Sequence, residues 1–468
     1  MLTYQDYLEL GENLDDSKKM RFVQSVIFDH KSSKLYTDAV DAEEYYKGLN
    51  VTAVKFEKML RTATGREVPD NFSPNHKTTR GFFRIFVDQL NQHLLGNGIT
   101  WGQDSTADAL GGDFDVQLQK LGRMAQIGAV SFGFWNLDHV DCFKVTEFAP
   151  LLDEQTGALR AGIRFWQIDN TKPLRATFYE EDGYTEYIWD YRDETSAEGT
   201  VLSPKRPYKV IVGTSEERGT EIIDGENYPG FPIIPLWANE SHISELAAIR
   251  TKIDAYDLMN NGFLNDLDSA QIFWLIKGAG GMDDEDLVRF LERINMLKIV
   301  DAEDGQDVQP VTVDIPHEAR EKILDRLERD LYKDAMALDL SEIKSGNVVK
   351  AQIEAAYEPL NTKSDAYEYC ILDFVSHLLE IAGIDDEPTF TRSMISNKSE
   401  EINTVLAGAQ YLPSEYITKK ILTILGDADQ IDDVLDMMAQ DEMDRFAIQQ
   451  DTTQEEENTQ TEEEDGDA

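Results

Sequence analysis

Two segments of helix-forming residues bracket a stretch of about 45 residues, and they constrain the fold of this chain more than any other feature. The first runs from about Ser241 to Ala270, and the second from His317 to about Leu340, a length of about 36 Å as a helix. In both, apolar residues recur every three or four positions and trace a narrow seam, which predicts long helices that bury one edge only. The seam residues are Leu246, Ile249, Ile253, Tyr256, Phe263 and Leu267, then Leu324, Leu327, Leu331, Ala335 and Leu338.

Two arrangements of these helices fit the pattern. The simpler is an antiparallel pair inside an ordinary helical domain, and the pattern alone favours it. In the other, helix pairs from several identical copies stand side by side and form the wall of a ring, with one face of each pair exposed to solvent. The mixed charge on the outer faces suits both.

The segments around the two helices are also patterned. Between them, "IFWLIKG", "DDEDLVRFLERIN", "LKIVDAE" and "VQPVTVDI" predict a small β-α-β-β module. After the second helix, "SGN" breaks the helical pattern in a stretch that carries Lys344 and Lys350. A third long helix is predicted from Val349 towards Ala382, with a kink at Pro359, and shorter helices follow near 398–410, 414–425 and 431–449.

The N-terminal half combines helices with a β-rich layer. Helical spacing covers about 16–48, 75–96 and 114–129, whereas short aromatic and β-branched runs of period two fill about 142–212. Asp182-Gly183 predicts a tight hairpin, because glycine supplies the positive φ that such a turn needs. The stretch "YPGFPIIPLWANE" ends this layer with three prolines.

Charge and cysteine usage exclude several classes of function. The 468 residues suit about three domains, and 90 Asp and Glu against 44 Lys and Arg give a net charge of -46. Such a chain repels phosphate backbones and anionic lipid, which disfavours tight, static binding to nucleic acid. Cys142 and Cys370 are far apart in sequence, which indicates a reducing compartment, and no apolar run predicts a membrane span, so we expect a soluble cytoplasmic chain. The acidic tail 451–468 is expected to be solvated.

The motifs do not indicate catalysis. "KGAGGMDDED" has the glycines of a phosphate loop, but it lacks the Lys-Ser or Lys-Thr pair and carries four acids. Asp138, His139, Asp141 and Glu147 contain metal-ligand side chains, but their spacing favours a solvated loop. The sequence contains neither an HExxH pair nor a GxSxG elbow. We therefore expect no enzyme activity, no cofactor and no metal site.

The succession of local motifs over nearly the whole chain resembles the portal proteins, or head-to-tail connectors, of tailed bacteriophages, in particular the siphophage type from Gram-positive hosts. The segments that carry the resemblance are "YTDAVDAEEYYKGLN", "PNHKTTRGFFRIFVDQLNQHLLGNGITW", "SGNVVKAQIEAAYEPLNTKSDAYE", "FTRSMISNKSEEINTVLAGAQYLPSEYI" and, most specifically, "FPIIPLWANESHISELAAIRTKIDAYDLMNNGFLNDLDSAQIFWLIKG". One departure is "QYLPSEY", which stands where many relatives have a Gly-x-Ser turn.

The resemblance implies an α+β portal fold, mainly helical and assembled as a ring. It places a wing of N-terminal helices and a β-rich layer at 1–238, stem helices at 239–270 and 316–340, and a small α/β clip between them at 271–315. A tunnel loop at 341–349, a long wing helix at 350–384, a crown at 385–450 and a disordered acidic tail at 451–468 complete the expected order. The stem residues expected to pack are Ile249, Ile253, Tyr256, Leu324, Leu327 and Leu331.

The resemblance also implies a function. Portal proteins form twelve-subunit rings at one capsid vertex, through which double-stranded DNA is packaged and later ejected without sequence specificity. The implied partners are the terminase large subunit, a head completion or adaptor protein, and the major capsid and scaffolding proteins, with no membrane. The protein would be a virion component assembled in the host cytoplasm.

A physical argument connects the tunnel loop with the acidic composition. Each basic residue that neutralises a phosphate adds to DNA affinity, with a log–log salt slope of about -0.9 per contact, so an acidic channel lets the duplex slide. Sparse lysines on a glycine-containing loop can touch the backbone without reading bases. We expect the loop residues Ile343, Lys344, Ser345, Gly346, Asn347, Val348 and Lys350 to face the duplex. The alternatives are a plain connector between surface helices, a capsid scaffold without a channel, and a metal-dependent nuclease.

Overall fold

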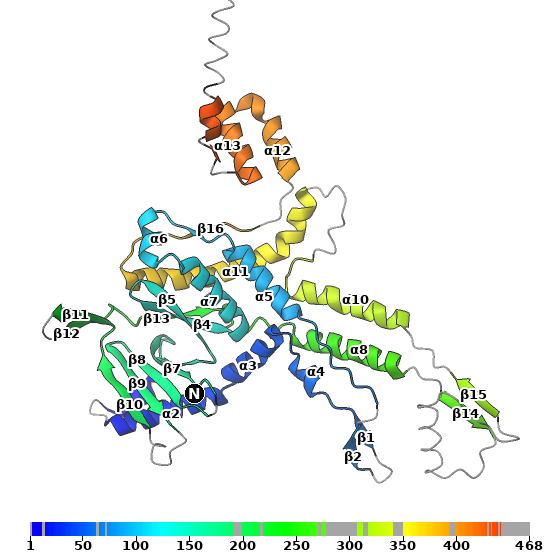
Figure 1. The fold of residues 1–468 in the computed structure, drawn as a ribbon. Helices are drawn as coiled ribbons and strands as arrows, with labels where there is room; N and C mark the ends of the chain where they lie inside the picture. The colour runs from blue at the N-terminus through cyan, green and yellow to red at the C-terminus, as the bar shows by residue number, and fades with distance from the viewer. Residues whose placement is uncertain are drawn as a thin grey trace, which may run out of the picture. The chain divides into compact units, whose positions relative to one another are not determined.

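The chain divides into two compact units, shown in Figure 1. One comprises Met1–Asp339 and Pro359–Ser393, and the other Leu340–Glu358 and Met394–Ala468. The computed structural model describes residues 2–11, 15–61, 65–70, 73–169, 171–190, 199–215, 219–269, 273–277, 307–311, 317–339, 350–393, 398–427, 430–431, 433–438 and 440.

The predicted combination of helices with a separate β-rich region is confirmed. The first unit begins with helices that match the expected range 16–48, but a break at Ser33 divides that range into two. The Ser33 hydroxyl accepts a hydrogen bond from the Tyr36 amide at 3.2 Å and caps the second helix. The helices are α1 (Tyr4–Glu9), α2 (Asp16–Ser32), α3 (Lys34–Tyr46) and α4 (Val51–Lys55).

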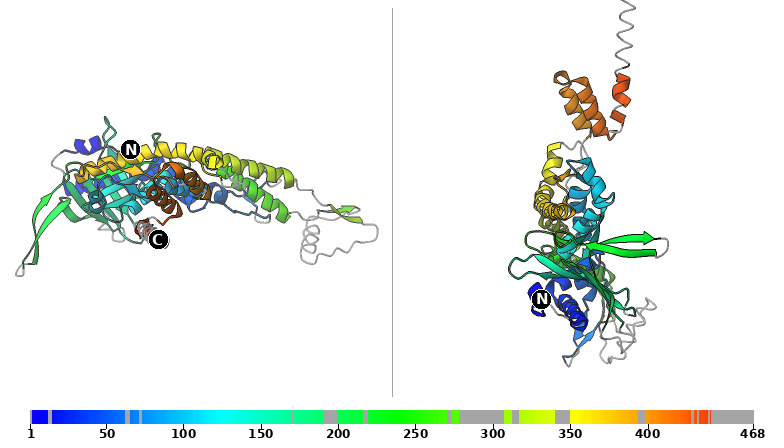
Figure 2. Two further views of the ribbon diagram at one scale, coloured as in Figure 1. Left: turned by 90° about the horizontal axis from the view of Figure 1, so that it is seen from above. Right: turned by 90° about the vertical axis from the view of Figure 1, so that its left-hand side faces the viewer.

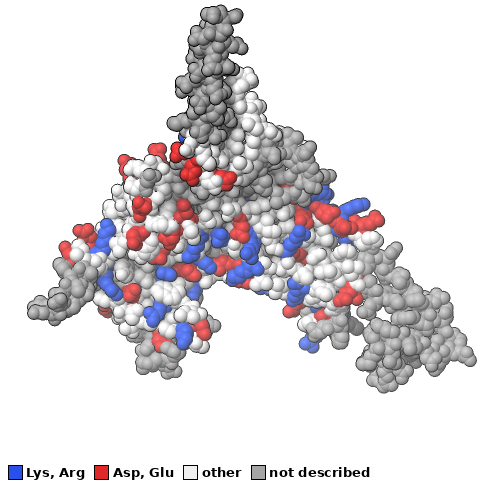
Figure 3. Space-filling model, turned by 45° about the horizontal axis from the view of Figure 1, so that its top comes forward, with Lys and Arg blue, Asp and Glu red and all other residues white. Residues whose placement is uncertain are grey.

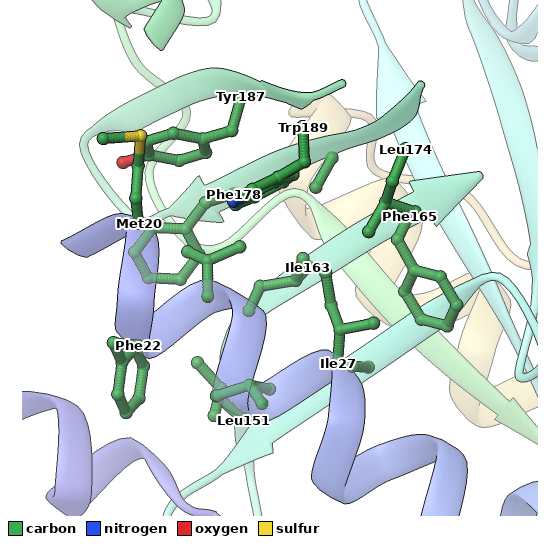
Figure 4. Close-up of a cluster of buried hydrophobic side chains, with 14 of the residues drawn as sticks. Met20, Phe22, Ile27, Leu151, Ile163, Phe165, Leu174, Phe178, Tyr187 and Trp189 are labelled. Carbon is green, nitrogen blue, oxygen red and sulfur yellow. The ribbon is translucent and has the colours of Figure 1, made fainter. Parts of the chain in front are cut away.

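The β-rich region forms an antiparallel five-stranded sheet in the order β10-β9-β8-β7-β6. Along β9, buried and half-buried residues alternate, as the period-two pattern predicts. Helix α2 packs on the sheet, and Figure 4 shows Met20 and Ile27 of the helix in the same core cluster as Phe178 and Trp189 of the sheet. The strands are β6 (Phe148–Leu152), β7 (Leu159–Trp166), β8 (Leu174–Glu180), β9 (Gly183–Trp189) and β10 (Thr200–Arg206).

The hairpin predicted at Asp182-Gly183 joins β8 to β9, but Gly183 is the first residue of β9 and not a turn residue as predicted. Gly183 pairs with Glu180 and opens β9, so the two turn residues are Glu181 and Asp182. Gly183 has φ +135°, and a Cβ there would lie 2.2 Å from the Arg206 carbonyl oxygen. Glycine is required by this positive φ and by the close approach of a neighbouring strand.

A second antiparallel sheet has the order β13-β4-β5. Pro235 lies in β13, an edge strand, where a missing amide leaves no ladder bond unmade within the sheet.

The β11–β12 hairpin projects from the body of this unit in both views of Figure 2. These strands are β4 (Val130–Asn136), β5 (His139–Lys144), β11 (Lys209–Ser215), β12 (Gly219–Glu226) and β13 (Ile233–Trp237), and two small pairs are formed by β1 (Met59–Arg61) with β2 (Glu67–Pro69) and β3 (Ile99–Thr100) with β16 (Thr389–Phe390).

Two apolar helices, α5 (Phe82–Leu95) and α7 (Phe114–Gly128), pack on each other in the first unit, with α6 (Asp104–Leu110) between them in sequence. The helix predicted from residue 75 begins only at Phe82. Residues 75–80 form neither helix nor strand, and their backbone bonds to another helix, as described below.

The two seamed helices are α8 (Arg250–Ser269) and α10 (His317–Asp334), and both are shorter than predicted. The chain before α8 turns at Ser244 and Glu245, which donate hydrogen bonds to the Ile127 and Gln126 carbonyls at the open end of α7. Helix α10 stops because Met336 adopts φ +52° and the amides of residues 336 and 337 bond back to the carbonyls of residues 333 and 332. At 18 residues, α10 spans about 27 Å.

Between these helices, β14 (Phe273–Lys277) pairs antiparallel with β15 (Asp307–Val311). They correspond to the first and last strands of the predicted β-α-β-β module, and its other parts lie outside the described residues. The phosphate-loop-like stretch and the acidic tail also lie outside them.

Helix α11 (Lys350–Ala382) is continuous through Pro359, the residue at which the first unit resumes. In the second unit, α12 (Lys398–Ala407), η3 (Ala409–Tyr411) and α13 (Ser414–Leu425) confirm two of the three predicted short helices, and residues 433–438 of the third are helical. Of the described helices, none combines the length and the hydropathy that crossing a bilayer requires.

Candidate functional site

Helices α8 and α10 lie side by side and run antiparallel (Figure 1). Lys252 forms an ion pair with Asp334, and fourteen residues further along α8, Asp266 pairs with Arg320 at 2.5 Å. The partners on α10 are also fourteen residues apart, so the two bridges hold opposite ends of the pair. The bridges are partly exposed, and they fix register more than they add stability.

The structure places the six predicted stem residues in one apolar cluster. Ile249, Ile253, Tyr256 and Leu331 are buried, and Leu324 and Leu327 pack against them half-buried. The cluster is wider than the predicted seam, because α3, α5 and α7 contribute Ala42, Tyr45, Phe82, Phe83, Phe86, Val87 and Ile127. The pair is therefore held against the body of the unit along these positions.

A row of buried polar side chains follows a second face of α8. Asp257, Asn261 and Asn265 are four residues apart, and each is at most 4% exposed. They accept hydrogen bonds from the amides of Arg80 at 3.1 Å, Thr78 at 2.8 Å and His76 at 2.7 Å, respectively. We call this set of three residues the polar ladder.

The spacing of the two partners explains the polar ladder. Every second residue of an extended strand advances about 6.6 Å, and every fourth residue of a helix advances about 6 Å. Alternate amides of residues 76–80 can therefore meet successive turns of α8. Asn261 also donates to the Thr78 carbonyl at 3.0 Å and accepts from its hydroxyl at 2.5 Å, so one side chain satisfies three groups of Thr78.

Asp257 is the charged member of the polar ladder. Burial raises its pKa to about 6, because desolvation disfavours the carboxylate, and nearby Asp254 adds repulsion. Hydrogen bonds from the Asn50 amide at 2.8 Å and from the Arg80 backbone act in the opposite direction. The site thus holds a carboxyl group whose charge changes in the mildly acidic range.

Arg80 joins residues 76–80 to α10. Its guanidinium makes two hydrogen bonds to the Glu328 carboxylate, at 2.9 and 3.1 Å, and one to the Tyr256 hydroxyl at 2.7 Å. It also lies 4.8 Å from the centre of the Phe82 ring. Both helices of the pair are therefore attached to the loop that precedes α5.

The ends of the pair nearest the body meet at Lys363 of α11. The Lys363 ammonium lies 2.7 Å from the Glu245 carboxylate and 2.9 Å from the Ala335 carbonyl oxygen. Just beyond, the Gln89 side chain of α5 bonds both backbone groups of Leu338, at 3.0 and 3.2 Å. One cation and one amide thus fix the segments that enter α8 and leave α10.

The predicted tunnel-loop residues Ile343, Lys344, Ser345, Gly346, Asn347 and Val348 lie outside the described residues. Lys350 begins α11, and its side chain also lies outside them. The polar ladder and Lys363 were not singled out from sequence. An Asp-x3-Asn-x3-Asn spacing on an otherwise apolar-seamed helix is the signal that could have found the ladder.

The residues considered for metal binding lie around the β4–β5 hairpin. His139 bonds its neighbour Asp138 at 2.8 Å, and this hydrogen bond raises the pKa of His139. Across the ranges given above, no group of three or more His, Cys, Asp or Glu side chains is arranged to hold a metal ion. Cys142 and Cys370 are free thiols.

Comparison with known proteins identifies the family. Residues 27–456 match the family described as "Phage portal protein, SPP1 Gp6-like". The portal protein of Bacillus phage SPP1 is 24% identical over 467 residues, covering 86% of this chain and 83% of the relative. The portal protein of Clostridium phage phiCD119 is 27% identical over 199 residues, covering 40% of this chain and 44% of the relative.

Among solved structures, a chain of "Neck of empty GTA particle computed with C6 symmetry" matches with a TM-score of 0.40 and 10% identity, over 74% of this chain and 90% of that one. The family match spans most of the sequence, including both helices of the pair and the segments that anchor them. This chain belongs to the phage portal protein family of the SPP1 Gp6-like type.

Proposed function

We propose that this protein forms the ring-shaped channel at one capsid vertex through which double-stranded DNA is packaged and ejected. The observation that carries the proposal is the family match over residues 27–456. The antiparallel α8–α10 pair, which occupies the region where the resemblance expects the stem, supports it. In a ring of twelve copies, such pairs would stand side by side around the bore.

We propose the domain assignment that the resemblance implies. Residues 1–238 form the wing, 239–270 and 316–340 the stem, and 271–315 the clip. The tunnel loop at 341–349 leads into the wing helix at 350–384, and the crown at 385–450 precedes the acidic tail. The anchoring by Lys363 and Gln89 supports a stem attached to the wing, so that forces on the stem reach the wing through these half-buried contacts.

The partners we propose are the terminase large subunit at the clip, a head completion or adaptor protein, and the major capsid and scaffolding proteins. The protein would be a virion component without enzyme activity, and the terminase would supply the energy for packaging. Its net charge of -46 supports a conduit that repels the DNA backbone and lets the duplex slide.

Electron microscopy of the purified full-length protein tests the ring. We expect annular particles with a central hole. A monomer, in isolation and in proheads, would overturn the proposal, and assembled particles without a hole would favour a capsid scaffold. A nuclease assay with Mg²⁺ tests the enzyme alternative, for which we expect no cleavage.

A second experiment tests the tunnel loop. Replacing Lys344 and Gly346 by alanine should lower the amount of DNA packaged or retained, while rings still form, because the loop loses one of its two lysines and the conformational freedom of its glycine. The matched control is Lys172→Ala, which removes a lysine from an exposed loop between β7 and β8. Unchanged packaging by the double variant would contradict the role of the loop.

A further inference from the structure

A pocket of about 300 Å³ lies between α3, α7 and the end of β5, away from the paired helices. Its floor includes apolar atoms of Tyr46, Met124, Ile127 and Val145. One acidic residue, Glu43, lines it together with four basic ones, an excess that is unusual in a chain with two acidic residues for each basic one. The basic residues are Lys47, Lys120, Arg123 and Lys144.

Three of these cations already have carboxylate partners. Lys47 pairs with Glu44 at 2.8 Å, Arg123 with Asp88 at 3.4 Å, and Lys144 with Glu43 at 3.6 Å. Lys120 is exposed, and no carboxylate of a described residue lies within ion-pair distance of it. The pocket therefore offers one unpartnered cation above an apolar floor, with further cations that can be shared.

This composition separates two kinds of anionic ligand. A DNA backbone is bound by several unpaired cations on a polar surface, and its phosphates gain nothing from an apolar floor. A protein segment that carries a carboxylate next to an apolar side chain can use both the cations and the apolar surface of the pocket. Protein interfaces commonly combine an apolar centre with charged residues at the edge in this way. Figure 3 shows basic side chains near the middle of one face of the molecule, interspersed with acidic ones.

We propose that the pocket receives an acidic side chain, with an adjacent apolar one, from a second copy of this chain. The inference rests on the proposed ring. Each copy carries 90 Asp and Glu residues, so neighbouring copies repel one another unless acidic side chains of one meet cations of the next. Lys120 supplies the free cation for that contact, and Tyr46 and Met124 supply the apolar surface.

Charge reversal tests the contact in the full-length protein. Lys120→Glu should weaken assembly at least about tenfold, measured as the protein concentration at half-assembly by sedimentation, because a like charge would then face the incoming carboxylate. Raising the salt concentration should narrow the difference from wild type. The control Lys172→Glu makes the same charge change at an exposed position outside the pocket and should assemble as wild type does.

Cross-linking identifies the occupant. In assemblies mixed from isotopically light and heavy copies, a zero-length carbodiimide should join Lys120 to an Asp or Glu of the other isotope. Normal assembly by Lys120→Glu, or cross-links within one copy only, would overturn the inference. Normal assembly with weaker binding of a labelled 30-base-pair duplex would instead assign the pocket to phosphates. If the wild-type protein itself stays monomeric, the proposed ring is wrong. That outcome is distinct from normal assembly of the Lys120→Glu variant, which contradicts only the proposed contact at the pocket.

Discussion

The Lys363 ammonium and the Glu245 carboxylate lie 2.7 Å apart, and both side chains are only 18% exposed. Lys363 belongs to α11, and Glu245 lies in the turn that precedes α8, so this ion pair joins elements more than a hundred residues apart in sequence. Its third partner is the carbonyl oxygen of Ala335 at the end of α10. A single ammonium thus joins the segments that enter α8 and leave α10 to α11.

We expect Lys363→Met to lower the free energy of unfolding by about 2–4 kcal/mol, because it removes the ammonium that faces the half-buried Glu245 charge and the Ala335 carbonyl. Urea unfolding followed by circular dichroism measures the change. The control is Lys252→Met, which breaks the exposed pair with Asp334 and should cost less than about 1 kcal/mol. An equal decrease in the free energy of unfolding in the two variants would contradict a larger contribution from Lys363 than from Lys252.

The polar ladder predicts that the side-chain amide of Asn261 contributes strongly to the stability of the protein. Asn261→Leu keeps the size of the side chain but removes the partners of three Thr78 groups, and should destabilise the protein by about 2–4 kcal/mol. The matched control is Asn260→Leu on the same helix, which loses one 3.3 Å bond to the Thr78 hydroxyl. Hydrogen exchange of the Thr78 amide should accelerate only in Asn261→Leu. If this amide remained as protected as in wild type, the ladder would not be what holds the segment.

Asp257 predicts a specific pH dependence. Its folded-state pKa of about 6 lies above its ordinary value of 3.8, so between these values the folded protein binds more protons than the unfolded chain does. The contribution of this group to stability is therefore greatest below pH 3.8 and is lost as the pH rises through 6. Two pKa units at about 1.4 kcal/mol each give a loss of about 3 kcal/mol.

The Asp257→Asn variant isolates this contribution. It has a constant cost, because its amide nitrogen faces the Asn50 amide nitrogen, but it lacks the titration. We expect the stability of the variant relative to wild type to rise between pH 4 and pH 7, measured by urea unfolding at each pH. A difference that stays flat over this range would show that Asp257 titrates normally.

Gly183 predicts strain in the β8–β9 hairpin. Gly183→Ala should lower the free energy of unfolding by about 3 kcal/mol, because alanine disfavours φ +135° and its Cβ would collide with the Arg206 carbonyl. Thermal unfolding measures the shift. Gly230→Ala serves as the comparison, since a Cβ at that position meets no atom within 4 Å. Similar melting temperatures for both variants would argue against strain at Gly183.

The sequence by itself determined where most of the long helices and the β-rich region lie, and it placed Ile253 and Leu331 in the buried seam, although the predicted seam residue Leu267 is 51% exposed. Apolar spacing encodes these features locally, because the period of the pattern is the period of the element. It also indicated a β-rich layer at about 142–212, and it indicated the family through its succession of motifs. The tunnel loop is a sequence-based prediction that the packing experiment tests.

Only the tertiary structure decided where α8 and α10 end and what anchors them. Helix α8 begins at Arg250 rather than Ser241, because Ser244 and Glu245 bond to α7, more than a hundred residues earlier in the chain. The polar ladder and Lys363 likewise satisfy backbone groups that are distant in sequence. Buried polar groups must find partners wherever the folded chain brings them, and a one-dimensional pattern does not carry that information.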